Sequence, residues 1–111
     1  MQISFMVSIQ EFQKLDLRVG EIISVEHVPN ADRLYVLNVD MGGKQVQLLA
    51  GIRQQYTEEE LKGKKIVVVA NLDPATIKGM TSEGMLLAAE HDGNISLVTL
   101  DKDLPVGSKV L

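Results

Sequence analysis

The sequence contains no cysteine and no tryptophan, and its 111 residues include only two tyrosines and two phenylalanines. The missing cysteines exclude disulfides, thiolate zinc sites and thiol nucleophiles. The four aromatic rings, at Phe5, Phe12, Tyr35 and Tyr56, are too few for a protein that binds nucleic acid by stacking a long row of bases. Any binding chemistry must therefore come from other side chains.

The chain also lacks an excess of positive charge: 11 Lys and Arg face 15 Asp and Glu, for a net charge of −4. This balance excludes a general, histone-like attraction to nucleic acid, so contacts with phosphates would need a local basic patch. The longest apolar run, residues 66–70, is too short to cross a bilayer, and the N-terminus does not have the pattern of a signal peptide. We therefore expect a soluble, cytoplasmic single domain with no membrane contact.

The N-terminal residues have the patterns of a strand and then of a helix. Apolar residues alternate over 3–7, which predicts a short strand. Ser8 and Glu11 have the spacing of a capping box and predict a short helix that runs to about Leu15. Phe12 and Leu15, three residues apart, are expected to face the core from this helix.

From Leu15 onward the apolar period changes to two, which is the period of a β-strand. The predicted inner face comprises Leu15, Leu17, Val19, Ile23 and Val25. Gly20 lies in the middle of this stretch, and glycines inside strands often mark bulges or bends. We interpret the stretch as one long strand that is bent or bulged at Gly20.

The remaining elements follow in an order that is typical of one fold. They are strands at 35–41 and 46–50 joined by a Gly42-Gly43 turn, a capped helix at 57–63, a buried strand at 66–70, and a hairpin of 85–89 with 95–100 around Asp92-Gly93. Three strands, a short helix and two strands form the chain order of an OB-fold. We therefore predict an all-β, five-stranded OB-fold barrel with a short helix between strands 3 and 4 and with N- and C-terminal extensions. A generic antiparallel barrel or sandwich is the alternative, and the position of the helix favours the OB-fold.

The patterns of catalytic and metal-binding sites are incomplete. Residues 79–84 have the glycine spacing of a phosphate loop, but Met85 stands where the loop needs a lysine. His27 and His91 are far apart and have no cysteine to assist them in binding a metal. Ser82 lacks the glycines that flank the nucleophile of a hydrolase. We expect no catalytic residue, metal or cofactor, and an enzyme is the weakest of the functional hypotheses.

A local basic patch is a candidate for phosphate contact. Lys62, Lys64 and Lys65 follow the predicted helix, and Lys78 comes later in the same stretch. Between residues 61 and 85 these four lysines face only two acids, which gives a local charge of +2 in a chain of −4. A solvated loop surface without function would produce the same pattern.

The segment around Ser82 has a second unusual property, because glycines and methionines flank its polar residues. Ser82 could donate a hydrogen bond to a phosphate or a ribose 2′-hydroxyl. Met85 could present an adaptable apolar surface to a base or a ribose. Alternatively, Met85 is the first core residue of the next strand, and the residues alone leave both interpretations open.

Three separate segments resemble one known family. They are Asp16-Leu17-Arg18-Val19-Gly20, Pro29-Asn30-Ala31-Asp32-Arg33-Leu34-Tyr35, and NLDPATIKGMTSEGM over residues 71–85. They are similar to the EMAP II-like tRNA-binding domain, which occurs as the C-terminal domain or beta subunit of methionyl-tRNA synthetases, in free-standing tRNA-binding proteins and in a bacterial secretion chaperone. The resemblance extends from about Ile9 to the C-terminus.

The resemblance implies an OB-fold barrel that binds the tRNA elbow by shape and catalyses nothing. It implies that Lys78, Ser82 and Met85 contact RNA, that Asn71 orders their loop, and that Asn30 and Arg33 belong to the motif between the first two strands. Basic side chains would position phosphates. Together with the basic patch, the expected tRNA-binding residues are Lys78, Ser82, Met85, Asn71, Arg33, Asn30, Arg53, Lys64 and Lys65.

The resemblance also implies partners other than tRNA. Free-standing members of the family are homodimers, so we expect residues 1–14 to provide a dimer contact and residues 15–111 to form the tRNA-binding domain. A methionyl-tRNA synthetase catalytic chain is a further expected partner. Asp73 and Thr76 stand where many members have basic residues, which predicts weak binding by one barrel. The alternative function is a protein-interaction or chaperone-like module, favoured by Met80, Met85 and the acidic net charge.

Overall fold

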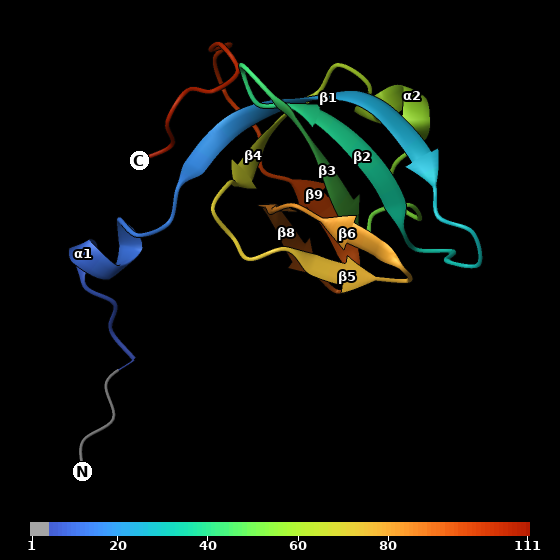
Figure 1. Cartoon of the computed structure of the whole chain (residues 1–111), viewed down its shortest axis with the longest axis horizontal. Helices are drawn as coiled ribbons and strands as arrows, with labels where there is room; N and C mark the ends of the chain where they lie inside the picture. Colours follow the sequence, from blue (N-terminus) through green and yellow to red (C-terminus); the bar gives the residue numbers. More distant parts are fainter. Residues whose placement is uncertain (1–4) are drawn as a thin grey trace.

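One long strand, β1 (Leu17–His27), organises the fold. The computed structural model describes residues 5–111 and is shown in Figure 1. The first half of β1 pairs antiparallel with β4 (Lys65–Val69), and its second half pairs antiparallel with β2 (Tyr35–Asp40). Because one strand serves two partners in turn, the sheet has to curl around it.

Two further strands extend this sheet at its ends. β3 (Gln45–Ala50) pairs with β2, and the short β7 (Met85–Leu86) pairs with β4, which gives the order β3-β2-β1-β4-β7. The predicted hairpin between β2 and β3 is present, with Gly42 and Gly43 both at positive φ. The outcome is the predicted five-stranded, OB-type barrel.

The predicted short helix is α2 (Glu58–Leu61), between β3 and β4. Thr57 caps it: the Thr57 hydroxyl accepts from the Glu60 N–H, and the Glu60 carboxylate accepts from the Thr57 N–H. The hydrogen bond from the Thr57 backbone is the main reason why the pKa of Glu60 lies below its ordinary value. Leu61, at the end of the helix, is completely buried against the barrel.

Alternate side chains of β2 and β3 point into the barrel interior, whereas β4, which the sequence predicted as a buried strand, is buried without alternation from Ile66 to Val69. Burial of these branched side chains is the main contribution to the stability of the domain. The largest side chains without solvent contact are Ile22, Leu37, Leu48, Leu61, Ile66, Val19, Val39 and Val68.

The N-terminal segment differs from its prediction. Ile3 lies outside the described residues, and residues 5–7 belong to no strand. The helix α1 (Ile9–Phe12) has its predicted capping box but ends earlier than predicted. Phe12 and Leu15 are 39% and 43% exposed, so the prediction that they face the core was wrong.

The irregularity in β1 also lies elsewhere than predicted. The register shift falls between Ile22 and Ser24, not at Gly20. As a result Ile22 is completely buried, whereas Ile23, predicted on the inner face, is 42% exposed. Gly20 has a different role: a Cβ built there would lie 2.6 Å from Val39 Cγ1, so the glycine allows two strands to pack closely.

Two hairpins stand beside the barrel. The first, β5 (Ala75–Ile77) with β6 (Met80–Ser82), occupies a segment that the sequence analysis took for a loop. The second, β8 (Ala88–His91) with β9 (Asn94–Leu97), has the predicted Asp92-Gly93 turn. The predicted strand over 85–89 is divided at Leu87, where the chain changes partners. The Leu87 N–H donates to the Val67 carbonyl in the register of β7 with β4, and the Leu87 carbonyl accepts from the Val98 N–H in the register of β8 with β9.

The C-terminal residues return to β1. The Val110 N–H donates to the Leu17 carbonyl at 2.8 Å, and the Val19 N–H donates to the Ser108 carbonyl at 2.9 Å. Leu111 remains 96% exposed next to this junction. Among residues 5–111, no helix is long and apolar enough to span a membrane.

The packing around Gly20 generates a stability prediction. Gly20→Ala should destabilise the domain by roughly 1–3 kcal/mol, because the added methyl overlaps Val39 and Met41 in the core. Gly51→Ala is the matched control, since its added Cβ would have no neighbour nearer than 3.9 Å. Urea unfolding of both variants measures the difference, and equal midpoints would contradict the close approach at Gly20.

Candidate nucleic-acid interface

The β5–β6 hairpin is attached to the barrel along the outer edge of β3. The Gln47 N–H donates to the Glu83 carboxylate at 3.0 Å, and the Glu83 N–H donates to the Gln47 carbonyl at 2.8 Å. The Leu49 N–H donates to the Ser82 hydroxyl at 3.1 Å. We call these four residues, Gln47, Leu49, Ser82 and Glu83, the seam. Two of its acceptors are side chains that occupy the place of a neighbouring strand's carbonyls.

Ser82 is the most buried residue of the seam. It is only 6% exposed, and its hydroxyl both accepts from Leu49 and donates to the Gly84 carbonyl at 2.9 Å. The one donor hydrogen of the hydroxyl and one of its two acceptor lone pairs are therefore used inside the domain. The structure gives Ser82 a positioning role, which the sequence analysis did not consider.

The hairpin also packs against the loop between β1 and β2. Met80 contacts a small apolar cluster formed by Val28, Ala31 and Val36. Lys78 and Gly79 form the tip of the hairpin, both at positive φ, so the chain reverses within two residues. The cluster under Met80 thus places the Lys78 tip next to the β1–β2 loop (Figure 1).

A cleft of about 310 Å³ lies between the hairpin tip and this loop. We call it the loop cleft. The predicted site residues Asn30, Arg33 and Lys78 all line it, although 45 positions separate Arg33 from Lys78 in the sequence. With Asp32 as its one carboxylate, the cleft carries two cations against one anion in a domain whose net charge is negative. Its lining is completed by Ala31 and Leu34.

Arg53, another predicted site residue, holds the β1–β2 loop through hydrogen bonds. Its backbone N–H donates to the Arg33 carbonyl at 3.2 Å, and its guanidinium donates to the Ala31 carbonyl at 3.1 Å. Two hydrogen bonds from one residue to successive turns of the loop hold Arg33 in place. Arg53 is half-buried, and its charged guanidinium is directed at the Ala31 carbonyl.

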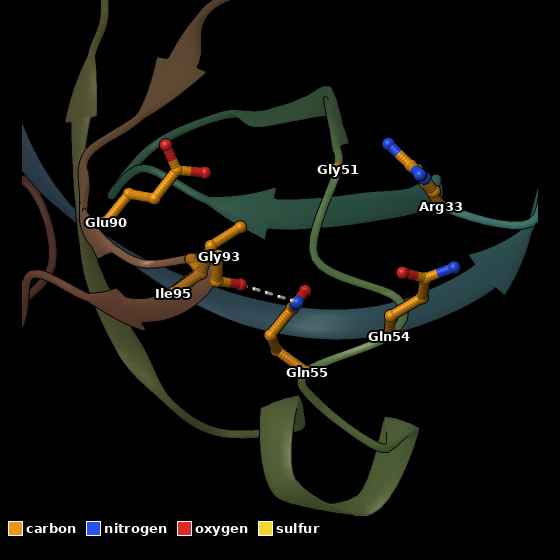
Figure 2. A pocket seen from close by; sticks show the side chains of 7 residues that line it. All are labelled: Arg33, Gly51, Gln54, Gln55, Glu90, Gly93 and Ile95. Carbon is orange, nitrogen blue, oxygen red and sulfur yellow. Dashed lines mark hydrogen bonds between the residues drawn. The ribbon is translucent and has the colours of Figure 1, made fainter.

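A second cavity, of about 320 Å³, adjoins the loop cleft, because Arg33 lines both. We call it the turn pocket; it is shown in Figure 2. The Gln55 side chain donates to the Gly93 carbonyl across it at 3.4 Å. It lies between the 51–55 turn and the β8–β9 hairpin, and its lining residues are Arg33, Gly51, Gln54, Gln55, Glu90, Gly93 and Ile95. The sequence analysis missed Gln54, Gln55 and Glu90.

Asn71 orders a different segment from the one expected. Its side-chain oxygen accepts from the Asp16 N–H at 2.8 Å, and its amide donates to the Lys14 carbonyl at 2.6 Å. Asn71 therefore ties the segment before β1 to the end of β4, whereas the prediction assigned it to the hairpin. This contact sets the direction in which α1 leaves the barrel.

The predicted basic patch is divided between different parts of the fold. Lys65 forms an ion pair with Asp103 at 2.5 Å and is only 20% exposed. The Lys64 ammonium lies 6.0 Å from the centre of the Tyr56 ring. Neither lysine lines the loop cleft, so only Lys78 of the patch reaches it.

Met85 belongs to an exposed apolar group. It is 47% exposed on β7, and Leu72 and Ile77 are 42% and 41% exposed in the same stretch of chain. The interpretation of Met85 as a core residue is therefore excluded. Within residues 5–111, no group of His, Cys, Asp or Glu side chains could hold a metal ion.

Residues 17–109 match the model of a family described as a putative tRNA binding domain. The chain belongs to this family. The tRNA-binding domain is 48% identical over 104 residues to the methionine–tRNA ligase of Methanococcus maripaludis strain C5. That match covers 94% of this chain and 16% of the ligase, so the chain spans about a sixth of the length of this relative.

Solved structures agree with this assignment. The MetRS-related protein from Pyrococcus horikoshii superposes with a TM-score of 0.91 at 34% identity, over 97% of this chain and 100% of that one. The CsaA chaperone protein from Picrophilus torridus superposes with a TM-score of 0.88 at 31% identity, over 96% and 100%. The matched region is a tRNA-binding module, and the matches cover no catalytic domain.

The seam generates a prediction for Ser82. Ser82→Ala should destabilise the domain by about 1–3 kcal/mol, because the Leu49 N–H loses its acceptor at a position shielded from water. Urea unfolding measures this loss, and hydrogen exchange of the Leu49 amide should become faster. Thr81→Ala, at an exposed neighbouring position, is the control and should change neither value. Unaltered exchange at Leu49 in Ser82→Ala would show that the seam does not depend on the hydroxyl.

Proposed function

We propose that this domain binds folded tRNA by shape and without catalysis, through the loop cleft and the tip of the β5–β6 hairpin. The observation that carries the proposal is the meeting of Asn30, Arg33 and Lys78 in one cleft of a chain that belongs to a tRNA-binding family. Two cations held at fixed positions by the seam and by Arg53 suit phosphates at a fixed spacing.

Shape is the property of tRNA that such a surface can recognise. The major groove of A-form RNA is deep and narrow, so side chains read backbone geometry and exposed loop bases instead. The tRNA elbow offers both. In our proposal Arg33 and Lys78 contact phosphates, Asn30 hydrogen-bonds to ribose or base, and exposed Met85 contacts an apolar face of the RNA. Lys64 and Lys65 contribute a more distant positive field, which the Asp103 ion pair reduces for Lys65.

Residues 1–14 provide a contact between two copies in this proposal, and residues 15–111 form the tRNA-binding unit. α1 is fully specified by its capping box, yet it buries none of its residues against the barrel. Such a short helix is not stable unless something packs on it. Phe5, Val7 and Ile9 are 91%, 67% and 60% exposed, and α1 forms an apolar groove of about 340 Å³ with Val110 and Leu111.

An interface between two identical copies would cover this surface and give the helix a partner. An isologous contact of this kind joins each exposed segment to the same segment of the other copy. The dimer would carry two loop clefts, so one tRNA could be held at two points with a higher effective affinity. A methionyl-tRNA synthetase catalytic chain could supply the second point instead, and either arrangement operates in the cytoplasm, where tRNA is aminoacylated.

A second candidate function is the binding of unfolded polypeptide. The exposure of Leu72, Ile77 and Met85, three apolar side chains within one stretch of 14 residues, favours it, because exposed apolar surface often marks a binding site. Binding of an unfolded chain that persists in high salt would support this candidate, since salt does not screen apolar contacts. tRNA binding through phosphates weakens with salt instead.

The loop cleft predicts the effect of removing Lys78. Lys78→Ala should weaken binding of many different tRNAs alike, about two- to fivefold near physiological salt, and should lower the log–log salt slope by about one. Filter binding or fluorescence anisotropy over a salt series measures both quantities. Lys102→Ala removes the same charge outside the cleft and should leave the slope unchanged. An unchanged slope for Lys78→Ala would remove this lysine from the interface.

The exposed N-terminal surface predicts an oligomeric state. The wild-type protein should sediment as a dimer, and Phe12→Glu should sediment as a monomer, because a charge buried in an apolar interface is costly. Val98→Glu is the control, since Val98 has the same 39% exposure but lies outside the α1 groove. Sedimentation velocity distinguishes the forms. A monomeric wild-type protein would refute the proposed contact.

A further inference from the structure

The turn pocket has a property that phosphate binding does not explain: a carboxylate faces it. Glu90 approaches from β8, and Arg33 lies on the opposite side of the pocket, as Figure 2 shows. Gln54 lies on the same side as Arg33, and Gln55 lies closer to Gly93, to which its side chain donates. A carboxylate repels phosphates and accepts hydrogen bonds, so beside the proposed RNA-binding cleft it suits an RNA group that donates hydrogen bonds and carries no negative charge.

In RNA the donors without charge lie on the edges of the bases and on the ribose hydroxyls. Guanine is the one standard base with two adjacent donors on its Watson–Crick edge, N1–H and the 2-amino group, and a carboxylate can accept both at once. The next atom group along this edge is the O6 acceptor, which requires a donor on the protein. Arg33 and Gln54 are donors across the pocket from Glu90.

We propose that the turn pocket binds the Watson–Crick edge of an unstacked guanine in RNA. Glu90 accepts from N1–H and the 2-amino group, and Arg33 or Gln54 donates to O6. Ile95 provides the apolar wall for the face of the base. This inference rests on the proposed function, because the RNA that enters the loop cleft also delivers the base.

The position of the pocket supports this assignment. Arg33 lines both cavities, so a strand whose phosphate contacts the loop cleft can place a neighbouring base in the turn pocket. The volume of about 320 Å³ is at the small end of the range for ligand sites and suits one nucleoside.

The walls of the pocket are held in place before any ligand binds. The Arg53 N–H donates to the Arg33 carbonyl on one side. On the other side, the Leu97 N–H donates to the Tyr56 hydroxyl, and this contact fixes the β8–β9 hairpin against the 51–55 turn. Binding a base therefore requires little rearrangement of the backbone around the pocket.

The other bases fit the pocket less well. Adenine and cytosine each offer one amino group to the carboxylate, with an acceptor nitrogen next to it that Glu90 would repel. Uracil offers one N–H between two carbonyl acceptors. Placing a carboxylate against an acceptor that has no hydrogen to share costs more free energy than the missing hydrogen bond alone. The pocket should therefore discriminate guanine from each of the other three bases.

The test uses kethoxal, which reacts with N1 and the 2-amino group of accessible guanines, on folded tRNA with and without the full-length protein. The wild-type protein should protect a guanine that is reactive in free tRNA. Glu90→Gln should reduce that protection by at least about fivefold, since a matched bidentate contact contributes that much discrimination or more. Glu59→Gln, which removes an exposed carboxylate outside the pocket, should protect as the wild type does.

Binding of the same tRNA is measured alongside, at protein concentrations that saturate it. If tRNA binds but no guanine is protected, or if Glu90→Gln protects as well as the wild type, the guanine site is wrong and the proposed function stands. If no tRNA binds at all, the proposed function fails and the guanine site fails with it. If Glu90→Gln still binds tRNA but no longer protects the guanine, the guanine site is supported. Removing a negative charge cannot by itself weaken the attraction to RNA, so the lost protection reports the lost contact.

Discussion

The hydrogen bonds of the seam connect β3 to the segment that follows β6, and the geometry of the interface depends on them. β3 stands at one end of the five-stranded sheet, so its outer N–H groups have no regular strand partner. The Ser82 hydroxyl and the Glu83 carboxylate accept from two of these N–H groups. Hydrogen bonds to side chains satisfy the N–H groups at the edge of β3 without a full neighbouring strand. The β5–β6 hairpin, which precedes these side chains in the chain, can therefore project from the barrel.

This arrangement explains why the proposed RNA-binding surface, the loop cleft, lies where it does. The seam holds the β5–β6 hairpin, and Met80 of this hairpin packs against the apolar cluster beneath the β1–β2 loop. Two loops from distant parts of the chain thus become the two walls of one cleft. Neither wall is long or rigid by itself, and each depends on contacts made outside the cleft, by Ser82 on one side and by Arg53 on the other.

The barrel could be predicted from the sequence because its strands are local patterns. The alternation in β2 and β3, the apolar run of β4 and the capped α2 each occupy a few consecutive residues, and all were located within a residue or two. The bulge at Ile23 could not be found, because a register shift depends on both partner strands. The β5–β6 hairpin was missed because each of its strands has only three residues and because a lysine is unusual at a positive-φ turn position.

The site residues were predicted by resemblance, but most of their roles needed the fold. Arg33 and Lys78 are brought together only by the packing under Met80, which no spacing in the sequence indicates. Glu83 looked like a charge that merely reduced a basic patch, whereas its carboxylate is part of the seam. Gln54, Gln55 and Glu90 become neighbours through the β8–β9 hairpin, so their meeting is a tertiary property.

The acidic net charge is compatible with the proposed RNA-binding surface and would contribute to its selectivity. At physiological salt a charge is screened within about 8 Å, so an RNA far from the cleft would feel little attraction. In the proposed function, the cations of the loop cleft act only when the shape of the RNA lets its phosphates come close, and elsewhere the carboxylates of the surface oppose contact. An RNA of the wrong shape would therefore meet repulsion before it could reach Arg33 and Lys78. Under this proposal, discrimination by shape follows from combining few cations in a cleft with an excess of acids around it.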